Sequence, residues 1–98
     1  MSEPESEEPE GWPCLLSDEV AELLADKALP ADVFGAIVAI TVAINETRGM
    51  VPGSTASAKW PQQRRIPLGA DGSLGVAEYV IVAEAAPPHI VLTRIQLY

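Results

Sequence analysis

Alternation of apolar and polar side chains along the second half of the chain predicts three β-strands, because successive residues of a strand point to opposite faces of a sheet. Short segments rich in Gly, Ala and Pro separate these strands and are typical of turns. Connections this short favour antiparallel pairing. In the last strand, Arg94 falls on the same face as Leu92. The predicted strands cover residues 64–68, 74–83 and 89–98.

The first half of the chain predicts one short strand and two helices. Residues 11–17 alternate but include a proline, which confines a strand to a sheet edge. Ser17 is a typical helix N-cap, and the spacing of apolar residues after it predicts a helix over 18–27. The apolar segment 31–45 is rich in β-branched residues, which favours a strand, but its length favours a helix. We interpret it as a helix that is apolar nearly all round and therefore central.

This order of elements predicts an α+β fold. An αα-hairpin should pack on one face of a small, mainly antiparallel four-stranded sheet, in the order β-α-α-β-β-β, and the other face should stay free. Residues 11–98 would then form a single domain, with residues 48–63 as a long loop. Residues 1–10 contain five Glu residues, no base and little to bury, so they should form a disordered acidic tail.

Charge narrows the range of partners. The chain has 98 residues, with 14 acidic and 6 basic side chains and a formal net charge of −8. Because nucleic-acid binding depends on Lys and Arg, this balance argues against a general nucleic-acid binder. Four of the six basic residues lie within residues 59–98, which carry only three acids, so the second half is mildly basic.

Further features bear on cofactors and location. Cys14 is the one cysteine and His89 the one histidine, so the sequence offers no internal disulfide and no ligand set for a structural zinc ion. It has no glycine-rich phosphate loop, and we expect no cofactor and no metal. The longest nearly apolar run, residues 33–44, is too short to span a membrane, and the acidic start is unlike a signal peptide. These features predict a soluble cytoplasmic protein without a membrane partner.

Parts of the chain resemble the RelE/ParE superfamily of bacterial type II toxin–antitoxin toxins. Residues 12–20 are similar to its opening strand, which ends in Ser where a helix begins at once. Residues 64–68 lie where the family has a basic strand. Residues 78–82 and 90–95 are similar to its central hairpin, whose last strand carries an Arg. The resemblance covers about residues 11–98 and rests on residue types.

This resemblance implies a toxin that inhibits bacterial growth. One branch of the superfamily cuts mRNA in the ribosome, and the other poisons DNA gyrase without nuclease activity. A cognate antitoxin neutralises both by wrapping the toxin with a helix or an added strand. The resemblance therefore implies an antitoxin as partner and gyrase or the ribosome as target. In the cutting branch it implies a metal-independent endoribonuclease.

Four residues are candidates for a catalytic role in RNA cleavage, which needs a general base, a general acid and cations that stabilise the phosphorane. Arg64 and Arg65 are neighbours on a strand, so one should face the free side of the sheet and the other the helices or solvent. Arg94 is either a phosphate contact or the partner of Glu78, since a mid-strand Arg needs a carboxylate or a site. Tyr98 is a candidate because the cutting branch often carries a functional Tyr or His near its C-terminus.

Three further side chains have two interpretations each. His89 is either an idle turn residue or a catalytic group, and Tyr79 is either a packed aromatic residue or a reactive one. Trp60 could stack on a base or a partner, or it could cap the core.

The acidic composition ranks the possible functions. Binding in a ribosomal cleft requires a basic protein, so we expect a toxin, or a toxin-like member, that binds a protein target. The mRNA endonuclease and a non-toxic interaction domain of the same fold are the alternatives. The apolar segment 31–45 also indicates surplus apolar surface, which an antitoxin helix or a second copy in a homodimer would cover.

Overall fold

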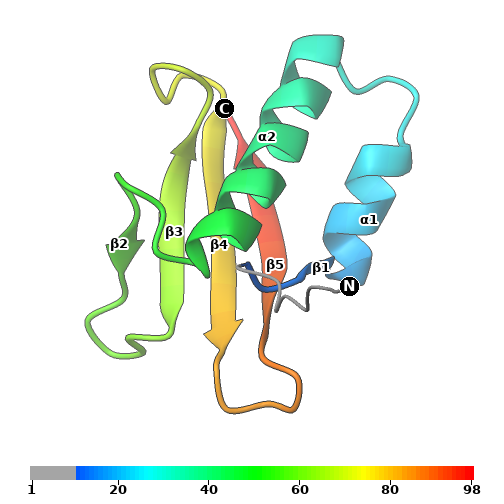
Figure 1. Ribbon diagram of the computed structural model, residues 1–98. Coiled ribbons are helices and arrows are strands. Elements are labelled where there is room, and N and C mark those ends of the chain that lie inside the picture. The colour runs from blue at the N-terminus through cyan, green and yellow to red at the C-terminus, as the bar shows by residue number, and fades with distance from the viewer. Residues whose placement is uncertain (1–10) are drawn as a thin grey trace, which may run out of the picture.

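Two helices and five strands form an α+β structure with two layers, and Figure 1 shows both helices on one face of the sheet. The structure is a computed structural model that describes residues 11–98. The acidic segment 1–10 lies outside the described residues, so its disorder stays a prediction. In chain order the elements are β1 (Cys14–Leu16), α1 (Asp18–Ala25), α2 (Ala31–Thr47), β2 (Thr55–Ala56), β3 (Gln63–Leu68), β4 (Gly75–Val82) and β5 (His89–Leu97).

The sheet has the strand order β1-β5-β4-β3-β2 and is mixed. Neighbours from β2 to β5 are antiparallel, whereas β1 pairs in parallel with the first part of β5. The prediction of four strands was wrong by one, because β2 has only two residues and lies inside the segment predicted as loop. Two residues give no readable alternation, and β2 is recognised as a strand by its pairing with Arg64 and Arg65.

A bulge in β5 changes the side of the sheet that each later residue faces. Glu78 of β4 is paired with Arg94 of β5. The next residue, Tyr79, is paired with Leu92, so Thr93 is an extra residue in β5. Arg94 is consequently exposed, whereas Leu92 is fully buried. The prediction that these two residues share a face was wrong, because the extra residue shifts the alternation by one position.

Helix α1 begins where the sequence predicts, at a capped turn. The Oγ of Ser17 accepts a hydrogen bond from the backbone N–H of Val20 (3.2 Å) and donates one to the carbonyl of Thr93 (3.0 Å). Asp18 and Glu19 occupy the first turn, where negative charge suits the helix dipole. The cap therefore ties the start of α1 to the bulged part of β5.

Helix α2 ends in a left-handed turn at Arg48 and Gly49. Gly49 has a φ of 88°, and a Cβ there would collide with the side chain of Ile81, so the position requires glycine. The hydroxyl of Tyr79 donates a hydrogen bond of 2.7 Å to the carbonyl of Gly49. This bond joins the C-terminal end of α2 to the middle of the sheet.

The chain between residue 11 and β1 packs on α2. A strand was predicted from residue 11, but β1 begins at Cys14. Trp12 instead exchanges two hydrogen bonds with Asn45, one from its backbone N–H (3.0 Å) and one to its carbonyl (2.7 Å). The guanidinium of Arg48 lies 5.4 Å from the centre of the Trp12 ring. These contacts hold the entry to the sheet against the end of α2.

The core lies between the helices and the sheet, and it is mainly aliphatic. Only one side of α2 contributes to it, so the prediction that this helix is central was wrong. The opposite side of α2 is exposed, because no further layer of the described chain packs there. The largest fully buried side chains are Val20, Ile37, Ile44, Leu68, Tyr79, Ile90 and Leu92.

Candidate functional site

The side of the sheet opposite the helices is uncovered by the rest of the described chain, and we call it the open face. Alternate residues of each strand point to it. Paired residues lie side by side, so these side chains form rows that cross the strands. The open face comprises Leu15, Thr55, Gln63, Arg65, Pro67, Val76, Glu78, Val80, Val82, His89, Val91, Arg94 and Gln96.

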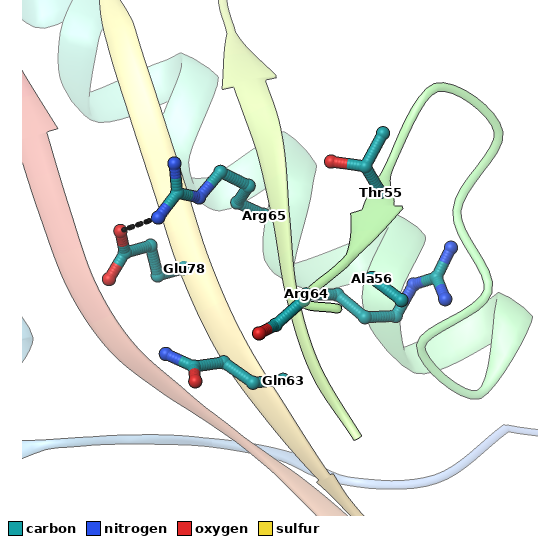
Figure 2. Close-up of a pocket in the computed structure, with 7 residues that line it drawn as sticks. Thr55, Ala56, Gln63, Arg64, Arg65 and Glu78 are labelled. Atoms are coloured by element: carbon teal, nitrogen blue, oxygen red, sulfur yellow. Dashed lines mark ion pairs between the residues drawn. The ribbon is translucent and has the colours of Figure 1, made fainter. Parts of the chain in front are cut away.

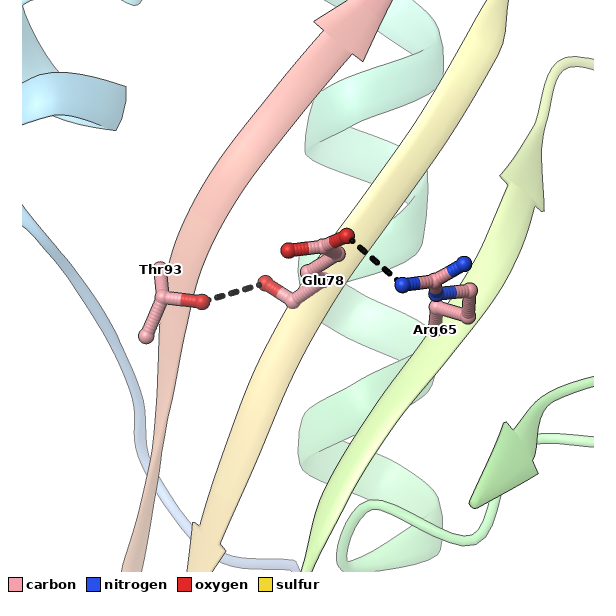
Figure 3. Close-up of polar contacts among 3 residues, drawn as sticks. All are labelled: Arg65, Glu78 and Thr93. Atoms are coloured by element: carbon pink, nitrogen blue, oxygen red, sulfur yellow. Dashed lines mark hydrogen bonds and ion pairs between the residues drawn. The ribbon is translucent and has the colours of Figure 1, made fainter. Parts of the chain in front are cut away.

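A charged row crosses the middle of the open face, and Figure 3 shows part of it with α2 behind the sheet. Nη2 of Arg65 lies 3.3 Å from Oε2 of Glu78. The hydroxyl of Thr93 donates a hydrogen bond of 3.1 Å to the carbonyl of Glu78. Arg94 is paired with Glu78 in the sheet, yet the carboxylate binds Arg65, and Arg94 forms no ion pair within residues 11–98. Arg94 and Glu78 are therefore cross-strand neighbours as expected, but the ion pair that was one of the two interpretations of Arg94 is formed by Arg65 instead.

Apolar side chains flank the charged row on both sides. Val80 is paired with Val91, which is paired in turn with Leu15, and these three form one apolar row. Pro67 and Val76 are paired on the other side of the charged row. The three valines are half-buried, and Leu15 is 49% exposed. The result is a polar centre with apolar margins.

Arg64 and Arg65 point to opposite sides of β3, as the alternation predicts (Figure 2). Nε and Nη2 of Arg64 donate hydrogen bonds of 3.0 and 2.9 Å to the Oγ of Ser54, and Nη2 donates another of 3.2 Å to its carbonyl. Both arginines line a hollow of about 300 Å³ beside β2. The bonds to Ser54 fix Arg64 to the loop, so of these two arginines only Arg65 can meet a ligand on the open face.

The four residues predicted to be catalytic do not meet at one point. Arg65 and Arg94 lie on the open face, on the two strands that flank β4. Arg64 points away from that face. Tyr98 follows the end of β5 and is 80% exposed. Arg64 and Tyr98 are about five residues apart along the strand direction, which is roughly 16 Å at about 3.3 Å per residue.

The structure decides between interpretations for two other candidates. Tyr79 is fully buried with its hydroxyl bonded, so it is the packed aromatic residue. Trp60 is 53% exposed and does not cap the core, and Nζ of Lys59 lies 5.8 Å from its ring centre. Nδ1 of His89 lies 3.1 Å from the carbonyl of Pro87 in the β4–β5 turn, and a catalytic role for this histidine stays a prediction.

Cys14 lies on the helix side of β1, where burial raises the pKa of its thiol from 9.0 to about 11. A thiol with so little thiolate at neutral pH is a poor nucleophile. Within residues 11–98 no three His, Cys, Asp or Glu side chains gather where they could hold a metal ion. No helix in this part of the chain is long and apolar enough to cross a membrane.

Sequence reasoning missed two residues that shape this region. Ser54 anchors Arg64 from a loop, and an isolated loop hydroxyl gives no periodic signal. Thr93 forms the bulge that turns Arg94 onto the open face, and no Gly or Pro marks the bulge in the sequence.

Comparison of the chain with models of protein families, with curated proteins and with solved structures found no match. Membership of the RelE/ParE superfamily accordingly stays a hypothesis that rests on the sequence segments alone.

Proposed function

We propose that this chain is a protein-binding domain whose binding surface is the open face. The composition of that face is the observation that supports this most directly. An antiparallel sheet with one face in water usually turns polar residues outward. Here the outward positions of β4 are Val76, Glu78, Val80 and Val82, and no helix of the described chain lies over them. Exposed apolar surface around a polar centre is typical of a surface that binds another protein and is unfavourable in contact with water.

The charges of the open face indicate what the partner carries. Arg65 and Arg94 flank Glu78, so the row has a net positive charge. The side chain of Glu78 is 16% exposed, whereas that of Arg65 is 65% exposed, so a partner would meet mainly guanidinium. Guanidinium groups bind carboxylates through paired hydrogen bonds. We expect a partner surface that is apolar and places an acidic side chain near Arg94.

In its most specific form the proposal is a toxin, or toxin-like, component of a bacterial type II toxin–antitoxin system. The sequence resemblance supports this form. The open face would bind a protein target in the cytoplasm, and a cognate antitoxin would neutralise the chain. Cleavage of mRNA would require Arg64 or Arg65, together with Arg94 and Tyr98, at one phosphate. Tyr98 lies four residues beyond Arg94 along the chain, so the sheet separates it from both arginines of β3. A net charge of −8 also suits a protein target better than ribosomal RNA.

Inducible expression in bacteria tests the proposal. The wild-type chain is compared with Arg65→Glu/Arg94→Glu, which reverses the charge of the open face. The matched control, Lys27→Glu/Lys59→Glu, changes the net charge by the same amount at two exposed residues outside that face. Growth curves and colony counts should show arrest by the wild type and the control, and growth with the open-face variant.

A second variant separates charge from shape. Val80→Arg places a long cation in the apolar row and should also abolish arrest, while circular dichroism confirms that each variant is folded. Arrest that survives both open-face variants would contradict the open face as the binding surface. A folded, soluble wild type that leaves growth unchanged would contradict the toxin form of the proposal.

A further inference from the structure

The exposed side of α2 is apolar along most of its length. Phe34, Val38 and Val42 recur at every fourth position and are 45%, 42% and 49% exposed. A surface helix normally presents polar and charged side chains on this side. The other side of α2 buries Ile37 and Ile44 completely. The helix is therefore apolar on two sides, and within the described chain only one of them is covered. We call Phe34, Val38 and Val42 the ridge.

A furrow of small residues runs beside the ridge. Ala31, Gly35 and Ala39 also recur at every fourth position and are exposed. Glycine weakens a helix relative to alanine. At Gly35 no described atom outside the local helix backbone lies within 4 Å of where a Cβ would stand, so packing inside this chain does not explain the glycine. A ridge beside a furrow, each following every fourth residue, is the surface on which a second helix packs.

The helical layer carries mainly negative charge. In α1, α2 and the segment that joins them, the exposed charged residues are six acids and one base, Lys27, and the exposed Arg48 follows the last residue of α2. A second copy of the chain would bring like charges together, whereas a partner with Lys and Arg would be attracted. The six acids are Asp18, Glu19, Glu22, Asp26, Asp32 and Glu46.

We propose that the exposed side of α2 binds a basic amphipathic helix of another protein. The apolar side chains of that helix would pack between the ridge and the furrow. Its Lys and Arg residues would lie near Asp32 and Glu46, which stand towards the two ends of α2. Figure 1 shows that α2 and the open face lie on opposite sides of the molecule. The surfaces differ in charge, so they would bind different partners, and this proposal does not depend on the function proposed for the open face.

Two designed peptides test the proposal by fluorescence anisotropy with the full chain. Each is roughly 18 residues long, about five turns of helix, with one leucine-lined side. One carries Lys at the margins of that side and the other carries Glu. The Lys peptide should bind at least about tenfold more tightly than the Glu peptide, and added salt should reduce the difference.

Three variants locate the binding surface. Val38→Asp should weaken binding of the Lys peptide by about tenfold or more, whereas Ala70→Asp, which adds the same charge in the β3–β4 turn, should leave it within about twofold. Gly35→Ala should raise the melting temperature of the chain, because alanine favours a helix more than glycine does. It should also weaken binding of the Lys peptide, because the added methyl group fills the furrow. A variant that is more stable yet binds the peptide more weakly would show that Gly35 serves binding and not the stability of the fold.

Several results would overturn the proposal. One is equal binding of the Lys and Glu peptides, and another is no binding of the Lys peptide up to about 1 mM. Gly35→Ala binding as tightly as the wild type would also contradict it. Sedimentation of the chain without peptide provides the last check. A dimer that Val38→Asp dissociates would assign the surface to a second copy instead.

Discussion

The two faces of the sheet differ in what they do, although the same strands supply both. On the face under the helices, Leu68, Tyr79 and Leu92 are fully buried. On the open face, Val80 and Val91 remain partly exposed beside a charged row. The alternation of side chains along each strand thus gives its two faces different roles. One set of residues supplies the apolar burial that stabilises the fold, and the other supplies the groups that a partner can reach.

Two adjacent residues of β5, one on each face, should differ most in their contribution to stability. Leu92→Ala removes a fully buried side chain and should lower the free energy of unfolding by about 3 kcal/mol. Val91→Ala, on the open face, should lower it by less than about 1 kcal/mol, because that side chain is partly exposed. Urea denaturation followed by circular dichroism measures both. Equal losses would mean that the open face belongs to the core.

The same division should govern the reactivity of β1. With the pKa of Cys14 at about 11 instead of 9.0, its alkylation by iodoacetamide at neutral pH should be roughly 100-fold slower in the folded chain than in urea. Cys14→Ala/Leu15→Cys moves the thiol to the open face and should react at nearly the unfolded rate. Mass spectrometry follows both reactions. Rapid alkylation of Cys14 in the folded wild type would contradict the assignment of faces.

A smaller effect is expected from one buried hydroxyl. Tyr79→Phe leaves the carbonyl of Gly49 without its donor and should lower the free energy of unfolding by about 1–2 kcal/mol. The control is Tyr98→Phe, whose exposed side chain makes no hydrogen bond within residues 11–98, and it should have no measurable effect. Thermal and urea unfolding measure both variants. An equal loss of unfolding free energy in the two would contradict a stabilising role for the buried hydrogen bond of Tyr79.

The smallest effects should come from the neighbouring arginines. Arg65→Ala breaks an exposed ion pair and should change the free energy of unfolding by less than about 0.5 kcal/mol. Arg64→Ala removes the hydrogen bonds to Ser54 and should cost about 1 kcal/mol. A larger loss at Arg65 than at Arg64, measured by urea unfolding, would reverse the roles assigned to them.

Sequence pattern predicted the features that depend on neighbouring residues. Ser17 marks the start of α1, because a cap needs only the next few residues. The alternation in β4 placed Ala77 and Tyr79 on one face and Glu78 and Val80 on the other, and the burial of these residues confirms it. The opposite directions of the arginines in β3 follow from the same alternation.

Features that depend on distant pairing could not be predicted in this way. The bulge at Thr93 is set by the register against β4 and by the bond from Ser17, which lies far away in the sequence. The parallel pairing of β1 with β5 likewise depends on tertiary structure. In α2 both sides are apolar, so the pattern did not show which side the sheet covers. The partner of Glu78 was undetermined because an arginine lies beside it on each neighbouring strand.

The extra residue in β5 has a consequence for how this chain can change during evolution. Removing Thr93 would leave Leu92 followed directly by Arg94, so the alternation would become regular, with Arg94 still on the open face and Ile95 still in the core. Loss of a second residue, such as Arg94, would instead turn Ile95 to the open face and Gln96 towards the core. Relatives of this chain should therefore tolerate the loss of residue 93 and substitutions at residues 94 and 96, but no second deletion between Leu92 and Ile95.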